Sequence, residues 1–304
     1  MSAASHAGAP MTGRVALVTG ATGGIGRATA VALAGRGAHV LLVARDRARG
    51  EDALRAAELA ARASGRGGSA AVLEADLSRQ ADVRRLAAEV LARVDRLDVL
   101  VNNAGALFDT RQTTPDGIEA TFALNHVAYF LLTTLLLDPL RAAGAVSPDG
   151  TPGDARVVVV ASNAHEAVRA LPLDDLQLER GWAPFRAYAV SKLANVMFAY
   201  ALARRLAGTG VAANALHPGV IASGFGTQST GVFAWLFRLG RPFFGTPEQG
   251  ARTSVYLAAD PAIRGATGGY YTNMRPARSS AASHDVAAQE ALWAASERLV
   301  GGWD

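Results

Sequence analysis

Tyr188 and Lys192 are a pair whose types and spacing could do proton chemistry. They lie four residues apart in a stretch with helical spacing, residues 187–206, so both side chains project from one helix face. A free tyrosine has a pKa of about 10, too high for an efficient base near neutral pH, but a nearby cation stabilises the phenolate. Such pairs are also common on helix surfaces. In a suitable fold, however, Tyr188 would exchange a proton with a substrate oxygen, and Lys192 would assist it.

Ser162 is the second candidate for chemistry. It follows a run of apolar residues, 155–160, that is typical of a buried strand. Active sites in parallel sheets gather where such strands end. The hydroxyl of Ser162 could there donate a hydrogen bond to a substrate oxygen and stabilise charge that develops on it.

A glycine-rich segment, TGATGGIG at residues 19–26, stands between a predicted strand and a predicted helix. Gly20 would permit a sharp turn, Gly24 would let a pyrophosphate approach the backbone, and Gly26 would let the helix pack closely. The start of a helix favours an anion. A glycine-rich turn alone can be purely structural, but the strand–turn–helix context predicts a dinucleotide site.

The second strand ends at Ala44 and Arg45, where dinucleotide folds usually carry an acidic residue for the ribose hydroxyls. A missing acid removes repulsion of a 2′-phosphate, and a guanidinium can pair with it. We therefore expect NADP(H), with NAD(H) as the alternative. Arg45 could instead be a solvated charge at a helix start, and the neighbouring Asp46 could blur the choice.

The elements around these residues alternate between strand and helix, and the strands are continuous apolar runs. Such strands are buried on both faces, as in a parallel sheet covered by helices. We predict a Rossmann-type, doubly wound α/β fold with a seven-stranded, mainly parallel sheet. The predicted strands lie within residues 14–20, 39–44, 70–77, 97–105, 155–162, 211–219 and 268–272, and the helices within 24–35, 48–63, 81–93, 118–140, 187–206 and 247–259.

The sequence suggests one domain, residues 13–304, after a disordered tail at residues 1–12. The segment 143–154 reads as a surface insertion. Half of the 304 residues are apolar, 18% are charged, and the longest apolar runs are far shorter than a bilayer span. The N-terminal residues contain no apolar segment, so we expect neither a secretory signal nor a membrane anchor.

The charge and the cysteine content narrow the classes of function. The net charge of +4 comes from scattered arginines without a basic run, which argues against nucleic-acid binding. There are no cysteines, so disulfides, thiolate ligands and a cysteine nucleophile are excluded. We expect a cytoplasmic protein. His126, His165 and His217 have no ligand spacing, and we predict no metal site.

The motifs together resemble the short-chain dehydrogenase/reductase family, single-domain branch. TGATGGIG, ADLS at 75–78, NNAG at 102–105, VVASN at 159–163, YAVSK at 188–192 and HPG at 217–219 appear in the family's order. The closer likeness is to the retinol-dehydrogenase-like group, carried by LNHVAYFLLTTLLL, SKLANVMF, NALHPGV and the C-terminal RPARSSAASHD and SERLVG. One departure is Ala161, where the family usually has a serine; the matching catalytic position is still Ser162.

The resemblance implies roles for individual residues. The catalytic set would be Asn125, Ser162, Tyr188 and Lys192. Asn125 would hold a water that links the lysine to solvent; alternatively it is a buried amide at a helix bend. Lys192 would also hold the nicotinamide ribose, and Asp76 the adenine amino group. The implied cofactor-binding residues are Gly20, Thr22, Gly24, Ile25, Gly26, Arg45, Asp76, Leu77, Asn103, Ala104, Gly105, Tyr188, Lys192, Pro218, Gly219, Ile221 and Ser223.

The substrate is expected to lie under a lid at residues 222–245. This segment contains VFAWLFRLGRPFF, which favours a lipophilic alcohol or carbonyl compound. The aromatic residues could equally be ordinary core, or could dip into a membrane surface. The resemblance also implies a homodimer or homotetramer, for which the stretch 118–140 is apolar enough.

Two other functions are alternatives to a dehydrogenase/reductase. A non-catalytic dinucleotide sensor of the same fold tends to lose the tyrosine or the lysine, and both are present. An epimerase or dehydratase of the extended branch usually carries TGxxGxxG and a larger C-terminal substrate domain, whereas this chain has TGxxxGxG and a short tail.

Overall fold

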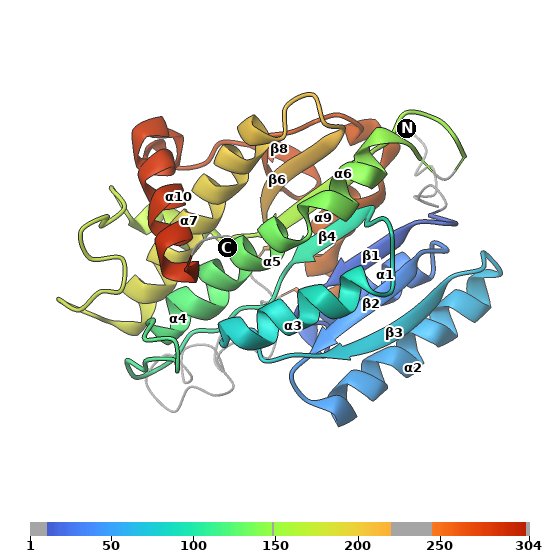
Figure 1. Ribbon diagram of the computed structural model, residues 1–304, viewed down its shortest axis with the longest axis horizontal. Coiled ribbons are helices and arrows are strands. Elements are labelled where there is room, and N and C mark those ends of the chain that lie inside the picture. The colour runs from blue at the N-terminus through green and yellow to red at the C-terminus, as the bar shows by residue number, and fades with distance from the viewer. Residues whose placement is uncertain (1–10, 148, 220–244, 302–304) are drawn as a thin grey trace.

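The computed structural model describes residues 11–147, 149–219 and 245–301, and the strands of this part form one eight-stranded sheet. The order across the sheet is β3-β2-β1-β4-β5-β6-β7-β8 (Figure 1). β1 to β7 are parallel, and β8 is antiparallel to β7. The strands are β1 Val15–Val18, β2 His39–Ala44, β3 Ser69–Glu74, β4 Val99–Asn102, β5 Ala155–Val160, β6 Val211–His217, β7 Tyr270–Thr272 and β8 Arg275–Ala277.

Helices cover both faces of the sheet. α1, α2 and α9 pack on one face, and α3, α5, α6, α7 and α10 on the other (Figure 1). The α-helices are α1 Gly24–Ala34, α2 Arg47–Ser64, α3 Gln80–Leu91, α4 Ala120–Phe122, α5 Ala128–Leu135, α6 Leu137–Ala145, α7 Pro184–Arg205, α9 Pro247–Ala259 and α10 Val286–Val300. The shorter helices are the π-helix η1 Ala123–Val127 and the 3₁₀ helices η2 Asn163–Ala167, η4 Pro261–Ile263 and η5 Ala281–His284.

The apolar strand runs form this sheet because the central strands contribute side chains to two cores, one on each face. Val157 and Val159 of β5 point into the core beneath α3, α5 and α7, whereas Val158 and Val160 point into the core beneath α1 and α9. Side chains alternate between the faces of a strand, so a strand that is buried on both faces must be apolar throughout. The predicted doubly wound Rossmann-type fold is confirmed.

The sheet has one more strand than the seven predicted. β8 pairs with β7 through a tight turn in which Asn273 and Met274 have φ angles of 50° and 61°. Two successive residues with positive φ are typical of the hairpin turns that match strand twist. Methionine rarely adopts this conformation and Pro276 stands inside the strand, so the sequence carried little signal for it.

The predicted helix at residues 118–140 is interrupted twice. α4 leads into η1, where the backbone N–H of Ala128 bonds to the oxygen of Ala123, five residues back. Further along, α5 ends at Leu135 and α6 starts at Leu137, with a bend of 58° between Ala120–Leu135 and Leu137–Ala145. No single helix in the described ranges is long and apolar enough to cross a membrane.

The described fold begins before residue 13, where we expected it to start. Met11 is 2% exposed, belongs to the core on the α1 face, and donates its backbone N–H to the oxygen of Arg36 at 2.7 Å. The first ten residues of the predicted tail lie outside the described residues.

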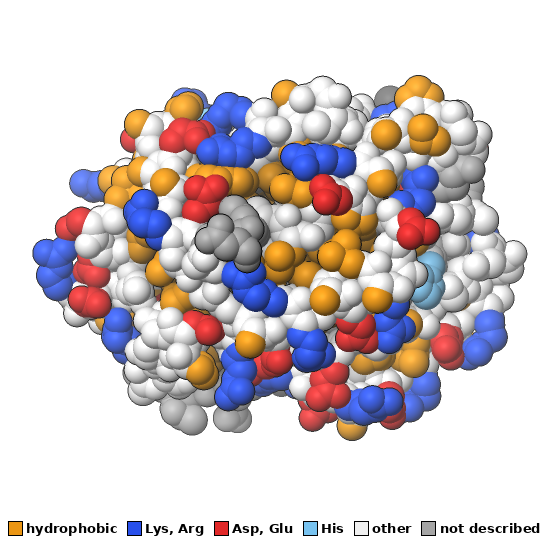
Figure 2. Space-filling model, viewed as in Figure 1, with side chains coloured by type: hydrophobic (Ala, Val, Ile, Leu, Met, Phe, Trp, Pro, Cys, Tyr) orange, Lys and Arg blue, Asp and Glu red, His pale blue; other side chains and the backbone are white. Residues whose placement is uncertain are grey.

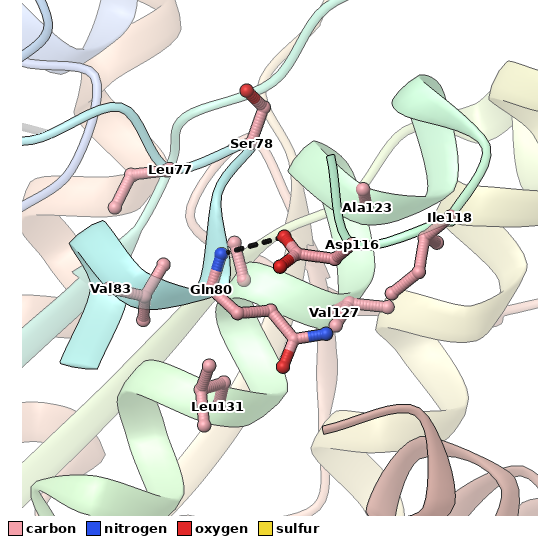
Figure 3. Close-up of a pocket in the computed structure, with 10 residues that line it drawn as sticks. Leu77, Ser78, Gln80, Val83, Asp116, Ile118, Ala123, Val127 and Leu131 are labelled. Atoms are coloured by element: carbon pink, nitrogen blue, oxygen red, sulfur yellow. Dashed lines mark hydrogen bonds between the residues drawn. The ribbon is translucent and has the colours of Figure 1, made fainter. Parts of the chain in front are cut away.

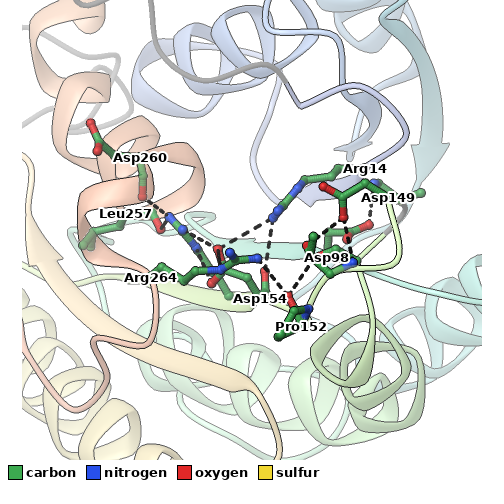
Figure 4. Close-up of polar contacts among 12 residues, drawn as sticks. Arg14, Asp98, Asp149, Pro152, Asp154, Leu257, Asp260 and Arg264 are labelled. Carbon is green, nitrogen blue, oxygen red and sulfur yellow. Dashed lines mark hydrogen bonds and ion pairs between the residues drawn. The ribbon is translucent and has the colours of Figure 1, made fainter.

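A buried ionic network ties the amino end of β5 to α9 (Figure 4). Arg156 forms two hydrogen bonds with Asp154, at 3.0 and 2.5 Å, and donates others to the carbonyl oxygens of Leu257 and Asp260. Arg14 and Arg264 approach the same aspartate. The guanidinium nitrogens of Arg156 are thus paired with oxygen acceptors, as a buried charge requires. The segment 143–154, which we predicted as a surface insertion, thus starts within α6 and ends at Asp154, where it is anchored by this network.

The outer surface mixes charges of both signs. Figure 2 shows Lys and Arg side chains interspersed with Asp and Glu over one face of the molecule. On the face shown, positive charge is therefore not gathered in one patch.

Candidate active site

The glycine segment makes the turn between β1 and α1. Gly20 has a φ of +64°, and a Cβ added to it would lie 2.8 Å from Cα of Ala104. A Cβ on Gly26 would lie 2.3 Å from the carbonyl oxygen of Gly20. Real side chains do not fit at these distances, so only glycine allows the start of α1 to pack against the strand ends.

Thr19 locks this turn to the end of β4. Its hydroxyl oxygen accepts hydrogen bonds from the backbone N–H groups of Asn103 and Ala104, at 2.8 and 3.0 Å. The side chain of Asn103 donates back to the carbonyl oxygen of Thr19 at 2.8 Å. Asn103 therefore holds the turn in place through both its backbone and its side chain. Thr19, which the sequence analysis did not single out, is a support of the candidate site.

The N-terminus of α1 is suited to an anion. Gly24 has a φ of +50°, and no side chain of the described residues caps the helix at Gly23. By contrast, α2 and α9 are capped by Asp46 and Thr246. The first backbone N–H groups of α1, including that of Ile25, are left for a phosphate. The partly buried Thr22 belongs to the same turn.

The end of β2 carries cations near the turn. Arg45 is exposed directly after the strand, and Asp46 uses its carboxylate to accept the N–H of Arg49 at 2.8 Å. The guanidinium of Arg49 would lie 3.4 Å from a Cβ on Gly23. Arg49 thus reaches the turn from the first turn of α2, a placement that depends on how α2 packs and that strand-end reasoning missed.

Asp76 and Leu77 follow β3. Asp76 accepts two hydrogen bonds on Oδ1 from Ser78, from the backbone N–H at 3.0 Å and the hydroxyl at 2.8 Å. Leu77 lines a small pocket beneath α3, about 10 Å³ in volume and roughly large enough for one water (Figure 3). A hydrogen bond from the backbone N–H of Gln80 to Asp116 crosses this pocket. The side chain of Leu77 is therefore a packing group.

Ser162 and Tyr188 meet at the carboxyl edge of the sheet. Ser162 begins η2, and its hydroxyl oxygen accepts the backbone N–H of Ala164 at 3.2 Å. A side-chain hydrogen bond joins Ser162 to Tyr188, which α7 carries in its second turn. The hydroxyl and the phenol, predicted from separate motifs, are thus direct neighbours.

Lys192 lies one turn further along α7 and is 3% exposed. Its Nζ donates to the carbonyl oxygen of Val160 at 2.9 Å and lies 5.6 Å from the ring centroid of Tyr188. A Cβ on Gly105 would lie 3.6 Å from this Nζ. Because Ala104 contacts Gly20, the lysine is connected to the glycine turn through two successive residues.

Asn125 is fully buried within η1 and braces the chain after β4. Its Oδ1 accepts the N–H of Ala106 at 2.9 Å, and its Nδ2 donates to the oxygen of Ala106 at 3.0 Å and to Ser191 at 2.9 Å. The alternative of a buried amide at a helix bend therefore describes its side chain. π-helical turns within α-helices occur frequently at functional sites. This one places Asn125 beside Gly105, which also adjoins Lys192.

Burial opposes the charged form of both titratable groups. It raises the pKa of Tyr188 to about 12, an effect that the hydrogen bond from Ser162 partly offsets. It lowers the pKa of Lys192 to about 7. The lowering of the tyrosine pKa that we expected from the lysine charge is thus outweighed by loss of solvation in the protein alone.

The remaining predicted residues lie near the end of β6. Pro218 and Gly219 are partly buried, and Gly219 has a φ of 91°. Ile221, Ser223 and the predicted lid, apart from its last residue Gly245, lie outside the described residues. His217 accepts the backbone N–H of Asn163 at 3.3 Å, which agrees with a local structural role. The described residues contain no group of three or more His, Cys, Asp or Glu side chains that could hold a metal ion.

Comparison with known proteins identifies the class. A family model for short chain dehydrogenases matches residues 14–173. Retinol dehydrogenase 14 of Mus musculus is 37% identical, over 96% of this chain and 87% of the relative. Polyprenol dehydrogenase of Homo sapiens is 35% identical, over 97% of this chain and 87% of the relative.

Solved structures agree. A crystal structure of a protein from Mycobacterium Paratuberculosis has a TM-score of 0.74 at 32% identity, with 97% of this chain and 96% of that chain covered. RhlG of Pseudomonas aeruginosa, in an NADP active-site complex, has a TM-score of 0.63 at 28% identity, with 90% and 98% covered. The chain belongs to the short-chain dehydrogenase/reductase family and is an oxidoreductase.

Proposed function

We propose that this chain uses NADP(H) to interconvert a lipophilic alcohol and its carbonyl compound, with Tyr188 as the acid/base. The observation that carries the proposal is the meeting of Ser162, Tyr188 and Lys192 at the carboxyl end of β5, next to the glycine turn. The turn offers helix N–H groups and closely packed glycines, which fit a dinucleotide.

The protein's own groups would handle the proton. A bound nicotinamide supplies or accepts the hydride. In reduction, the Tyr188 hydroxyl gives its proton to the substrate oxygen, and in oxidation its phenolate takes one. Ser162 accepts the N–H of Ala164, which leaves its hydrogen for the substrate oxygen or for Tyr188. Protonated Lys192, 5.6 Å from the ring centroid of Tyr188, stabilises the phenolate that proton donation produces.

Asn125 would act on this machinery through the backbone. Its amide holds Ala106 from both sides, and a Cβ on the preceding Gly105 would lie 3.1 Å from its Oδ1. The role of a water-mediated relay, implied by the family resemblance, would then fall to the backbone around Asn125, because the described contacts already use both ends of the side chain.

Two observations support NADP(H). No carboxylate directly follows β2 at position 45, and the next one, Asp46, is engaged in capping α2. The guanidinium of Arg49 lies beside the turn, and Arg45 directly follows β2, so the chain offers two cations that suit a 2′-phosphate. A neighbour from Beutenbergia cavernae, with 30% identity and a TM-score of 0.62, is described with bound NADP.

A lipophilic substrate is supported by the relatives and by exposed apolar side chains in the segment that leads to Tyr188. Two of the similar proteins are named for retinol and polyprenol. Phe185, in the first turn of α7 just before Tyr188, is 41% exposed, and Leu173 is 40% exposed in the segment that leads to α7. Small-molecule sites are lined mainly by apolar side chains, so exposed apolar residues in this segment agree with an apolar ligand.

We infer a homodimer or homotetramer and a cytoplasmic location from the family resemblance and the composition. The apolar residues of 118–140 are not an argument for association, because Phe130, Leu131 and Leu132 are at most 1% exposed within one chain.

The test is an absorbance assay with NADPH and NADH against aliphatic, aromatic, steroid and retinoid carbonyl compounds, with small charged ones as controls. We expect NADPH to be consumed stoichiometrically with an apolar carbonyl compound. Turnover of only the small charged compounds would refute the lipophilic proposal. Tight NADPH binding without any turnover would instead favour the dinucleotide sensor.

A further inference from the structure

Two buried histidines connect the segments that carry Ser162 and Asn125 to residues 279–300. His165 is bonded to Ser280, 115 positions away, and His126 to Ser296, 170 positions away. Both rings are at most 1% exposed. Neither histidine belongs to the proton chemistry described above, so their polar contacts call for a separate explanation.

His165 bridges Ser162 and Ser280 with both ring nitrogens. Its Nδ1 lies 2.7 Å from the carbonyl oxygen of Ser162, and the backbone N–H of Ser280 donates to Nε2 at 3.0 Å. A carbonyl oxygen only accepts and a backbone N–H only donates. His165 is therefore neutral and carries its proton on Nδ1. Burial also lowers its pKa, in agreement with the neutral form.

His126 makes the corresponding connection from η1, where it follows Asn125. Its Nε2 lies 2.9 Å from the hydroxyl oxygen of Ser296, which donates its own hydrogen to the carbonyl of Leu292 at 2.8 Å. With its hydrogen on the Leu292 carbonyl the serine accepts, so we infer that His126 carries its proton on Nε2, the opposite tautomer to His165. Burial lowers the pKa of His126 to about 4, in agreement with a neutral ring.

Residues 279–300 are themselves fixed to the α7 side of the sheet. The hydroxyl of Ser279 lies 2.7 Å from that of Tyr200 in α7 and 2.7 Å from that of Ser283. In α10, the ring of Trp293 packs on Phe130 of α5 and Phe198 of α7, with centroid distances of 4.9 and 5.9 Å. The histidines thus connect the catalytic segments to a rigid support.

We propose that residues 279–300, here called the C-terminal clamp, position the catalytic groups: His165 sets the backbone at Ser162, and His126 sets the π-helix that presents Asn125. Both histidines are positioning residues, since neither lies among the proposed proton-transfer groups. The inference rests on the proposed function in that Ser162 is taken to hold the substrate oxygen. A small displacement of such a group can lower the rate by about 100-fold.

Ordinary packing would not require this arrangement. Phenylalanine could fill a similar volume, yet at each site the histidine meets a polar group of the clamp with the nitrogen that matches its hydrogen-bonding type. A purely structural role would affect stability alone, whereas positioning of Ser162 must affect the hydride-transfer step.

The test compares three substitutions at His165. His165→Asn keeps a donor near the position of Nδ1 for the Ser162 carbonyl, His165→Gln keeps an acceptor near Nε2 for Ser280, and His165→Phe keeps neither. We expect His165→Phe to lower kcat by about 10- to 100-fold, with KM and the NADPH Kd changed less than about threefold. His165→Asn should recover most of the lost kcat and His165→Gln should not.

His39→Phe is the matched control. His39 is a partly buried histidine at the start of β2, where it bonds Ser69 at 2.7 Å, far along the sheet from Ser162. Its replacement should lower Tm and leave kcat unchanged. The clamp is wrong if His165→Phe retains kcat within twofold of wild type, or if it loses no more kcat than His39→Phe at equal loss of Tm.

Nitrogen-15 NMR of the imidazole groups tests the geometry without any turnover. At pH 7 the wild-type protein should show a neutral Nδ1–H tautomer for His165 and a neutral Nε2–H tautomer for His126. Ser296→Ala should shift the His126 signals and leave those of His165 in place. A charged His165, or one protonated on Nε2, would overturn the clamp; failure to reduce any carbonyl compound, with both tautomers as expected, would overturn the proposed function instead.

Discussion

Lys192 donates a hydrogen bond from Nζ to the backbone carbonyl oxygen of Val160 at 2.9 Å. Val160 is the last residue of β5 and stands two positions before Ser162. The lysine therefore ties α7 to the strand from which Ser162 emerges. Lys192 both fixes this geometry and supplies a charge. We therefore expect its replacement to change stability and rate separately.

Replacing Tyr188 by phenylalanine removes the hydroxyl and keeps the ring. Loss of a general acid/base lowers rates by about 10²- to 10⁴-fold, so we expect kcat for carbonyl reduction to fall by at least about 100-fold. NADPH binding, measured by fluorescence titration, should change less than about threefold. Tyr256→Phe, in α9 on the other face of the sheet, is the control and should retain activity. Activity in Tyr188→Phe near the wild-type level would exclude Tyr188 as the acid/base.

The charge of Lys192 makes stability depend on pH. Burial lowers its pKa from 10.5 to about 7, so between these values the unfolded chain binds more protons than the native protein, and stability rises with pH. At about 1.4 kcal/mol per tenfold change, the penalty below pH 7 is on the order of 5 kcal/mol.

The measurement is urea denaturation without cofactor, at pH 7 and pH 10, of the wild type and of Lys192→Met. The methionine variant cannot be charged, so its stability advantage over the wild type should be larger at pH 7 than at pH 10. An advantage that is equal at both pH values would show that burial does not depress this pKa.

Arg45→Asp should reverse the cofactor preference. It places a carboxylate after β2, where it would accept ribose hydroxyls and repel a 2′-phosphate. A hydrogen bond between charged groups contributes about 1.5–3 kcal/mol, so kcat/KM with NADPH should fall by about 10- to 100-fold. Arg47→Asp is the control, because Arg47 is directed to Glu51 at 3.2 Å and its side chain is 78% exposed. An unchanged NADPH/NADH ratio in Arg45→Asp contradicts the cofactor proposal.

Thr19→Val should destabilise the glycine turn. It removes the hydroxyl that accepts the N–H groups of Asn103 and Ala104 and leaves both without that acceptor. Each unsatisfied buried group costs about 1–3 kcal/mol, so the free energy of unfolding should fall by roughly 2–4 kcal/mol. Thr19→Ser keeps the oxygen and should restore most of this loss in the same denaturation experiment. Equal stability of the valine and serine variants would show that the Thr19 hydroxyl does not stabilise the turn.

Asp154→Asn tests the ionic network in Figure 4. It leaves the buried Arg156 guanidinium without its carboxylate, and breaking a buried pair in this way costs about 3–5 kcal/mol. Because the network lies at the amino end of β5, opposite Ser162, kcat should stay within about twofold at a temperature where the variant is folded. A large fall in kcat in the folded variant would show that the two ends of the strand are coupled.

The elements that carry the site were predictable because their signals are local. The apolar strand runs, the glycines at 19–26 and the four-residue spacing of Tyr188 and Lys192 each depend on neighbours in sequence. The contact of Ser162 with Tyr188 followed once both were assigned to the carboxyl edge of one parallel sheet.

Other features depend on contacts between distant residues and carried no local signal. Residues 118–140 are mostly apolar, and nothing in their spacing indicates that Asn125 will bind the backbone of Ala106 within a π-helix. Thr19 and Arg49 become visible only when β4 and α2 are packed beside the turn. The sequence of α10 resembles the family but indicated no function. The residues that α10 contacts lie in η1 and α7, far away in the sequence.

The bond between His126 and Ser296 also has a consequence for biosynthesis. Residues around Ser296 leave the ribosome after every strand of the sheet, so a nascent chain can build its nucleotide-binding half before the support of η1 exists. Enzyme activity should therefore appear only late in translation, and a ribosome-stalled chain ending before α10 should bind dinucleotide while remaining catalytically silent.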